Sequence, residues 1–159
     1  MSRKPKTAAS GFTAEGYRTA AEEHVTAARE LHEAGQYVLS HYVAGLAVEC
    51  LFRAYRFRFD PEFDARHDLH ALYRASRFDA LIPEGVKTEV SAALSEVILR
   101  WNNDYRFRSA ASLRTHLRKA GLSRSIKGDF VKESSRRITE AAFRIVNLGV
   151  SLWNRSSKS

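Results

Sequence analysis

The segment YVAGLAVECLFRAY, residues 42–55, limits the possible folds more than any other part of the chain. On a helix it is apolar around most of its circumference, and its small residues leave room for a neighbouring helix to approach closely. Glu49 lies in the middle of the segment, and Arg53 follows one turn later. Because burying an unpaired carboxylate is costly, we expect Glu49 to pair with Arg53, or with Arg106 or His67 from another helix. The segment should form a central helix or a helix at a subunit interface.

The remainder of the chain is also patterned for helices. Apolar residues recur every three or four positions, as on an amphipathic helix, and only three prolines interrupt the 159 residues. We expect helices over residues 13–34, 36–59, 68–76, 109–120 and 130–153, and a fourth helix from Pro83 through Tyr105. Thr13 and Asp68 are typical helix-capping residues. The pattern predicts an all-α fold, an up-and-down four- to five-helix bundle with short helical insertions, whose first two helices form an antiparallel hairpin at Gly35.

The length corresponds to one domain. We expect a disordered basic tail over residues 1–10, a single helical domain over residues 11–155 and a short tail over residues 156–159. Cys50 is the one cysteine, which excludes an intrachain disulfide and a thiol-based metal cluster, and its apolar surroundings favour a buried, inert thiol. The chain has no apolar stretch long enough to span a membrane and no signal-peptide pattern, so we expect a cytoplasmic protein that does not contact a membrane.

The positive charge is concentrated in one part of the chain. Residues 100–137 contain eleven Lys and Arg against three acids, an excess of +8 that equals the net charge of the whole chain. A segregated basic surface attracts polyanions or an acidic partner. This pattern therefore favours a nucleic acid, a nucleotide or an acidic protein as the ligand, with a merely solvated basic face as the alternative.

Three sequence features together resemble the HEPN family of small helical domains. Residues 44–51 read AGLAVECL, His67 begins a His-Asp-Leu motif, and Trp101 is followed by the pair Arg106 and Phe107. The resemblance covers about residues 13–153. It implies an up-and-down helical bundle, usually a homodimer, that works on RNA or nucleotides. Many HEPN domains are metal-independent ribonucleases of toxin–antitoxin or phage-defence systems, and others are non-catalytic partners of small nucleotidyltransferases.

The ribonucleases of the family carry an arginine one to two helical turns before a histidine. The histidine can move a proton to or from the ribose hydroxyl, and the arginine stabilises the phosphate. Here the corresponding segment, RWNNDYRFRS from Arg100, contains no histidine. The next one, His116, follows Arg106 by ten residues and lies beyond the expected end of that helix.

The sequence RHDLH at residues 66–70 offers two further histidines, His67 and His70. Its Arg66 precedes His70 by four residues, but on a loop and a short helix rather than on the fourth helix. Both histidines lack an evident third ligand for a metal ion, and Asp68 fits a helix cap. We therefore expect no metal ion and no other cofactor.

We expect a domain that binds RNA or a nucleotide, or that is the partner of a nucleotidyltransferase or an antitoxin in a toxin–antitoxin or defence-type system, without being an enzyme itself. The predicted ligand-binding residues are Arg100, Arg106, Arg108, Asn102, Asn103 and Glu49, with Arg114, Arg118 and Lys119 nearby; Glu49 would orient an arginine. One alternative is a divergent metal-independent ribonuclease that uses Arg106 with His116, His67 or His70. Another is a structural helical adaptor that binds an acidic protein.

Overall fold

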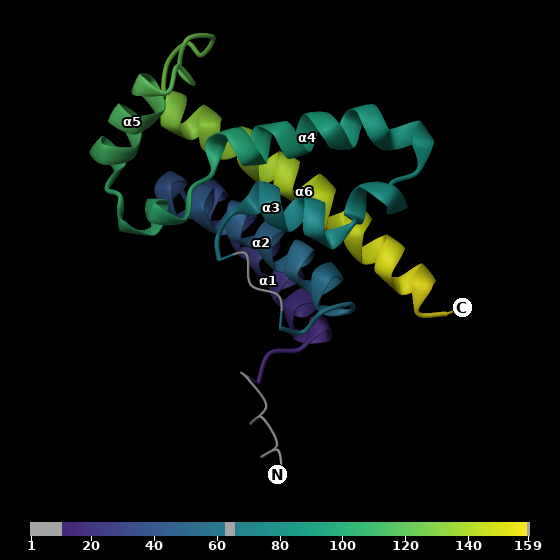
Figure 1. Cartoon of the computed structure of the whole chain (residues 1–159). Helices are drawn as coiled ribbons and strands as arrows, with labels where there is room; N and C mark the ends of the chain where they lie inside the picture. Colours follow the sequence, from purple (N-terminus) through teal and green to yellow (C-terminus); the bar gives the residue numbers. More distant parts are fainter. Residues whose placement is uncertain (1–10, 63–65, 159) are drawn as a thin grey trace.

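The computed structural model describes residues 11–62 and 66–158, which form helices and no strands (Figure 1). The α-helices are α1 (Ala14–Glu33), α2 (Tyr37–Phe57), α3 (Leu69–Ser76), α4 (Lys87–Arg100), α5 (Ala110–Lys119) and α6 (Phe130–Ser156). Short 3-10 helices lie between them: η1 (Phe78–Leu81), η2 (Glu84–Val86) and η3 (Asn103–Phe107). The predicted all-α fold is confirmed.

Helices α1 and α2 form the predicted hairpin. Thr13 caps α1 by accepting a hydrogen bond from the backbone N–H of Gly16 at 2.9 Å. The chain reverses at Gly35, whose φ of 78° lies in the left-handed region that favours glycine. Helix α6 then packs against α1, α2 and α4, so that α2 is enclosed by α1, α3 and α6 (Figure 1).

Two glycines let neighbouring elements approach α2 closely. A Cβ atom on Gly45 of α2 would lie 1.9 Å from Cδ1 of Trp101, and one on Gly149 of α6 would lie 2.5 Å from Cδ2 of Leu51. Trp101 is fixed in this position because its indole N–H donates to the backbone oxygen of Tyr42 at 2.9 Å. Gly45 therefore leaves room for the Trp101 ring on α2, and Gly149 leaves room for Leu51 on α6.

The predicted fourth helix is wrong at both ends. Helix α4 begins at Lys87, after the 3-10 turn η2, and ends at Arg100; Trp101 has extended backbone angles (φ −105°, ψ 139°). One tertiary contact and one local hydrogen bond stop the helix. Trp101 turns inward against Gly45, and the side chain of Asn102 accepts a hydrogen bond from the backbone N–H of Asp104 at 2.8 Å, which competes with helical bonding. Tyr105 consequently lies in η3 and not on α4.

Helix α5 stands at one end of the molecule, away from the main core (Figure 1). A small second cluster of buried residues holds it: Tyr105, Leu113, Leu117 and Val131, with Tyr37, Val38, Tyr42, Leu122 and Phe130 packed around them. No helix in the described part of the chain combines the length and the apolar character needed to cross a bilayer. Residues 1–10, predicted to be a disordered tail, lie outside the described residues.

Candidate functional site

Glu49 is almost completely buried in the middle of α2, and its carboxylate is paired. One oxygen, Oε1, accepts from Nε of Arg53 at 2.9 Å and lies 2.9 Å from Nδ1 of His67. The other oxygen, Oε2, has no hydrogen-bond partner in the described part of the chain. Two of the three predicted partners of Glu49, Arg53 and His67, are therefore confirmed, whereas Arg106 contacts Asn103 at 3.4 Å instead.

The hydrogen bond to Glu49 sets the orientation of the His67 ring. A neutral imidazole that donates its Nδ1–H to the carboxylate keeps Nε2 as a proton acceptor. The His67 side chain is about half exposed and lines a pocket of about 410 Å³. The pair thus places a histidine, held by a buried carboxylate, at the edge of a cavity.

Two distant segments form this pocket, which we call the His67 pocket. Residues 66–70, at the start of α3, supply one side, and Ile98 with residues 101–104 supply the other. The pocket therefore brings together four predicted site residues, His67, His70, Asn102 and Asn103, with Glu49 behind His67.

Asp68 caps α3, as predicted, by accepting from the backbone N–H of Ala71 at 2.9 Å. This role occupies the one carboxylate that lies between His67 and His70 in the sequence. Within residues 11–62 and 66–158, no three His, Cys, Asp or Glu side chains are arranged to hold a metal ion.

Arg100, a predicted ligand-binding residue, is buried and does not line the His67 pocket. Its Nε lies 2.5 Å from Oε2 of Glu96, and its Nη1 donates to the Ser134 hydroxyl at 3.1 Å. Ser134 is also 2.9 Å from Nε2 of His41. Arg100 therefore belongs to a polar cluster that links α2, α4 and α6 inside the bundle.

His41 is the residue of this cluster that the sequence analysis missed. It is fully buried, and burial, reinforced by the positive charge of Arg100, lowers its pKa to about 3. The sequence contains a signal for this burial, because His41, Gly45, Val48 and Phe52 are spaced by four, three and four residues along one face of α2.

His116, the third histidine candidate, lies on α5 and does not line the His67 pocket. Its ring packs edge-on against Tyr105, with centroids 5.4 Å apart. Burial, and to a lesser degree Arg108, lowers the pKa of His116, which favours its neutral form. The structure thus groups His67 with His70 and separates both from His116.

A second candidate site is a surface of unpaired cations on η3, α5, the loop that follows it and the start of α6. We call this the basic surface; its members are Arg106, Arg108, Arg114, Arg118, Lys119, Arg124, Lys127 and Lys132. All except Arg108 are exposed. Figure 1 shows that α5, its loop and the start of α6 lie at the same end of the molecule.

No acid in the described residues forms an ion pair with any member of the basic surface, whereas acids neutralise Arg18, Arg53, Arg136, Arg137 and Arg144. Aromatic rings lie among these cations. The guanidinium carbons of Arg114 and Arg118 are 6.0 and 5.6 Å from the Phe130 ring centre. Phe107 is 76% exposed, although it is one of the largest apolar side chains. Cations and accessible rings on one surface suit the phosphates and bases of a nucleic acid.

Comparison of the chain with known protein families, curated proteins and solved structures found no match. The resemblance to HEPN domains, and the nucleotidyltransferase or antitoxin partner that it implies, therefore remain predictions.

Proposed function

We propose that this protein binds RNA through the basic surface. One observation carries the proposal: eight lysines and arginines lie together at one end of the molecule, and no acid of the described residues pairs with them. A fold that needed these cations only for internal ion pairs would have placed acids beside them, as it does along α1 and α6. Each unpaired cation can instead neutralise a phosphate and release a counterion.

The aromatic side chains favour RNA with unpaired bases over a duplex. Phe107 and Phe130 lie next to Arg106, Arg114 and Arg118. Bases stack on such rings when they are free of a complementary strand, and each stacked base contributes about 1–3 kcal/mol.

Binding of a fluorescent single-stranded RNA tests this proposal. We expect Arg114→Glu with Arg118→Glu to weaken binding roughly tenfold or more, because two phosphate contacts become repulsive. The matched control is Arg155→Glu with Lys158→Glu, which changes the net charge equally near the end of α6. An equal loss in both pairs of variants would show that net charge, and not this surface, governs binding. If the unmodified chain does not bind RNA, an acidic protein becomes the preferred ligand.

The Glu49–His67 pair favours a second candidate function, cleavage of the bound RNA without a metal ion. In this reaction Nε2 of His67 accepts the proton of a ribose 2′-OH, and the oxygen attacks the adjacent phosphorus. The bond from phosphorus to the 5′-oxygen breaks, and a protonated His70 gives its proton to that oxygen. The products are a 2′,3′-cyclic phosphate and a free 5′-hydroxyl. Arg106, which contacts the pocket residue Asn103, is the candidate cation for the phosphate.

Incubation of RNA with the protein in EDTA tests the second candidate. We expect any cleavage to be lost in His67→Ala and retained in His116→Ala, because of these two histidines His67 lines the pocket and is held by a carboxylate, whereas His116 lies on α5. The reverse pattern would assign the reaction to His116. If the unmodified protein retains RNA without cleaving it, it is a binding protein only.

A further inference from the structure

The His67 pocket combines apolar and polar lining residues, as sites for small organic groups usually do. Leu69, Ile98 and Trp101 supply apolar surface, and residues 102–104 add two asparagines and an aspartate. The volume of about 410 Å³ lies within the range of about 300–1,000 Å³ that is usual for small-molecule sites. The pocket can therefore accept one nucleobase that is not paired with another strand.

Both walls of the pocket are anchored to α2, so their polar groups are held in place before a ligand binds. On one wall, Glu49 holds His67 at 2.9 Å, and the side chain of Arg53 donates to the backbone oxygen of Arg66. On the other wall, the indole N–H of Trp101 donates to a backbone oxygen of α2 at 2.9 Å. A site that is ordered in advance loses less free energy when it binds its ligand.

The wall at residues 102–104 offers hydrogen-bond donors next to an acceptor. Oδ1 of Asn102 accepts from the backbone N–H of Asp104 at 2.8 Å, which leaves the two N–H groups of the Asn102 amide as donors. Oδ1 of Asn103 accepts from Nη1 of Arg106 at 3.4 Å, which leaves its amide N–H groups in the same way. The Asp104 carboxylate, by contrast, supplies acceptors.

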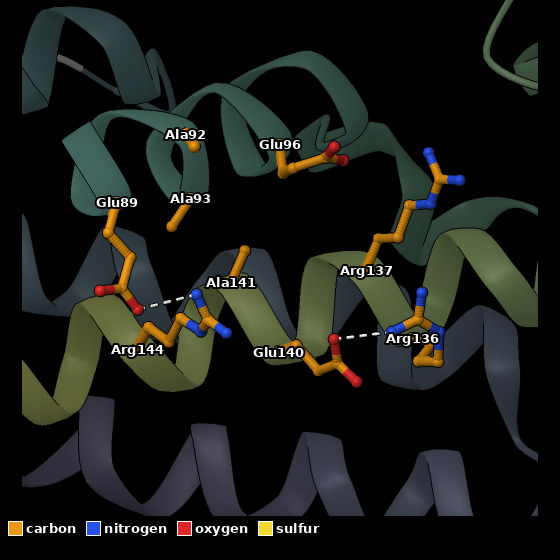
Figure 2. A pocket seen from close by; sticks show the side chains of 9 residues that line it. All are labelled: Glu89, Ala92, Ala93, Glu96, Arg136, Arg137, Glu140, Ala141 and Arg144. Atoms are coloured by element: carbon orange, nitrogen blue, oxygen red, sulfur yellow. Dashed lines mark hydrogen bonds and ion pairs between the residues drawn. The ribbon is translucent and has the colours of Figure 1, made fainter.

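The Asp104 carboxylate is available to a ligand. Among residues 11–62 and 66–158, no cation forms an ion pair with Asp104. Arginines do neutralise acids in the surface groove between α4 and α6. There Nη1 of Arg144 lies 2.8 Å from Oε1 of Glu89, and Nη1 of Arg136 lies 2.7 Å from Oε2 of Glu140 (Figure 2). The acid in the His67 pocket therefore differs from those of the groove in having no such partner.

We propose that the His67 pocket binds an unpaired guanine base, an inference that rests on the RNA binding proposed above. The Watson–Crick edge of guanine carries two adjacent donors, N1–H and N2–H, and one acceptor, O6. The two donors match the two oxygens of the Asp104 carboxylate, and O6 matches an amide N–H of Asn102. Adenine, cytosine and uracil each have one donor atom on this edge, so none of them can bind a carboxylate through two parallel hydrogen bonds.

Guanine in this pocket also determines which ribose lies near the histidines. The base contacts residues 101–104, and its ribose extends toward the opposite wall, which His67 and His70 line. The basic surface holds the RNA backbone without regard to sequence, and the pocket selects the base. The substrate class is therefore single-stranded RNA that contains an accessible guanine.

Calorimetric titration of the full chain with the 3′-monophosphates of guanosine, adenosine, cytidine and uridine tests the proposal. We expect the guanosine compound to bind roughly tenfold or more tightly than the other three, because a bidentate pair discriminates strongly between bases. Asp104→Asn should reduce this preference to less than about threefold, because an amide offers one acceptor atom where the carboxylate offers two. The matched control is Asp79→Asn, the same change at an exposed position of η1 that does not line the pocket.

Inosine 3′-monophosphate keeps the test decisive if Asp104→Asn does not fold, which circular dichroism would show. Inosine lacks the N2 amino group of guanosine, so it should bind the unmodified chain roughly tenfold more weakly than the guanosine compound. Equal binding of these two ligands would overturn the assignment of the carboxylate to the guanine edge.

The same preparation is also titrated with single-stranded RNA, which separates this inference from the proposed function. If RNA binds but the four nucleotides bind equally, or none of them binds, the guanine pocket is overturned and RNA binding stands. If guanosine is preferred but RNA does not bind, the pocket is supported as a nucleotide site and the role of the basic surface is overturned. If neither RNA nor any nucleotide binds, both proposals are overturned.

Discussion

At the scale of single residues, His41 illustrates how burial sets the dependence of stability on pH. Its pKa is about 3 in the folded protein because burial and Arg100 disfavour the charged ring, whereas an exposed histidine titrates near about 6.5. Between these values the unfolded chain binds a proton that the folded chain does not. Stability from neutral His41 is therefore fully present above pH 6.5 and is lost as the pH falls toward 3.

Urea unfolding of the unmodified chain and of His41→Gln at several pH values between 7 and 4 measures this effect. Below pH 6.5 the unmodified chain should lose about 1.4 kcal/mol per pH unit more than the variant. The pKa of Glu133 is lowered to about 2, chiefly by a hydrogen bond from Arg136. Protonation of Glu133 in acid lowers the free energy of unfolding of both proteins equally, so its contribution cancels in the comparison. If the free energy of unfolding falls with pH along the same slope for both proteins, His41 is not the group that sets this pH dependence.

Also at the residue scale, substitutions of Glu49 and His67 should destabilise the protein to different degrees. Glu49→Ala removes the carboxylate that pairs with the largely buried Arg53, whose remaining partner is the backbone oxygen of Arg66, and breaking such a pair destabilises by about 3–5 kcal/mol. Glu49→Gln keeps an oxygen that can accept from Arg53 and should destabilise less. His67→Ala should change the free energy of unfolding by less than about 1 kcal/mol, because the imidazole is half exposed. Urea midpoints in any other order would contradict this interpretation.

At the scale of secondary-structure elements, the contact between α2 and the end of α4 depends on Gly45. A methyl group there would overlap the Trp101 ring, so Gly45→Ala should reduce the free energy of unfolding by about 3 kcal/mol or more. The matched control is Gly85→Ala in η2, where an added Cβ meets no atom within 4 Å and the change should stay within about 0.5 kcal/mol. Chemical denaturation measures both; equal effects would show that Trp101 can move aside.

Helix α5 should be less stable than the helices of the main bundle. It is ten residues long, and Leu113 and Leu117 are the two of its side chains that are buried, both in the small second cluster. Local opening of an element with so few buried apolar contacts requires less free energy than global unfolding. Hydrogen–deuterium exchange should therefore be faster for amides of α5 than for those of α2, and bound RNA should slow it. Equal protection of both helices without RNA would contradict this expectation.

At the scale of the whole molecule, the concentration of positive charge on the basic surface predicts that RNA binding depends strongly on salt. If about four phosphates are neutralised, the logarithm of the binding constant should fall with the logarithm of salt concentration with a slope of about −3 for single-stranded RNA. The slope should become less steep by about 1 to 2 units for Arg114→Ala with Arg118→Ala. A slope near zero would show that the basic surface does not carry the affinity.

The sequence by itself determined those features that depend on residues close together in the chain. The three-to-four spacing of apolar residues specified the helices, and the side chains of Thr13 and Asp68 specified two of their starts. The pairing of Glu49 with Arg53 also follows from the sequence, because residues four positions apart lie together on a helix. The location of the basic surface followed from charge counts alone.

Only the tertiary structure decided where α4 ends and which candidate residues meet. Trp101 leaves the helix because Gly45, far away in the sequence, provides the space that its ring fills. This turn places residues 102–104 beside His67 and forms the pocket. The same packing buries Arg100, which the sequence analysis had assigned to ligand binding. Helical periodicity is a local property, but the end of a helix and the exposure of a charge depend on contacts between distant segments, which only the packed structure contains.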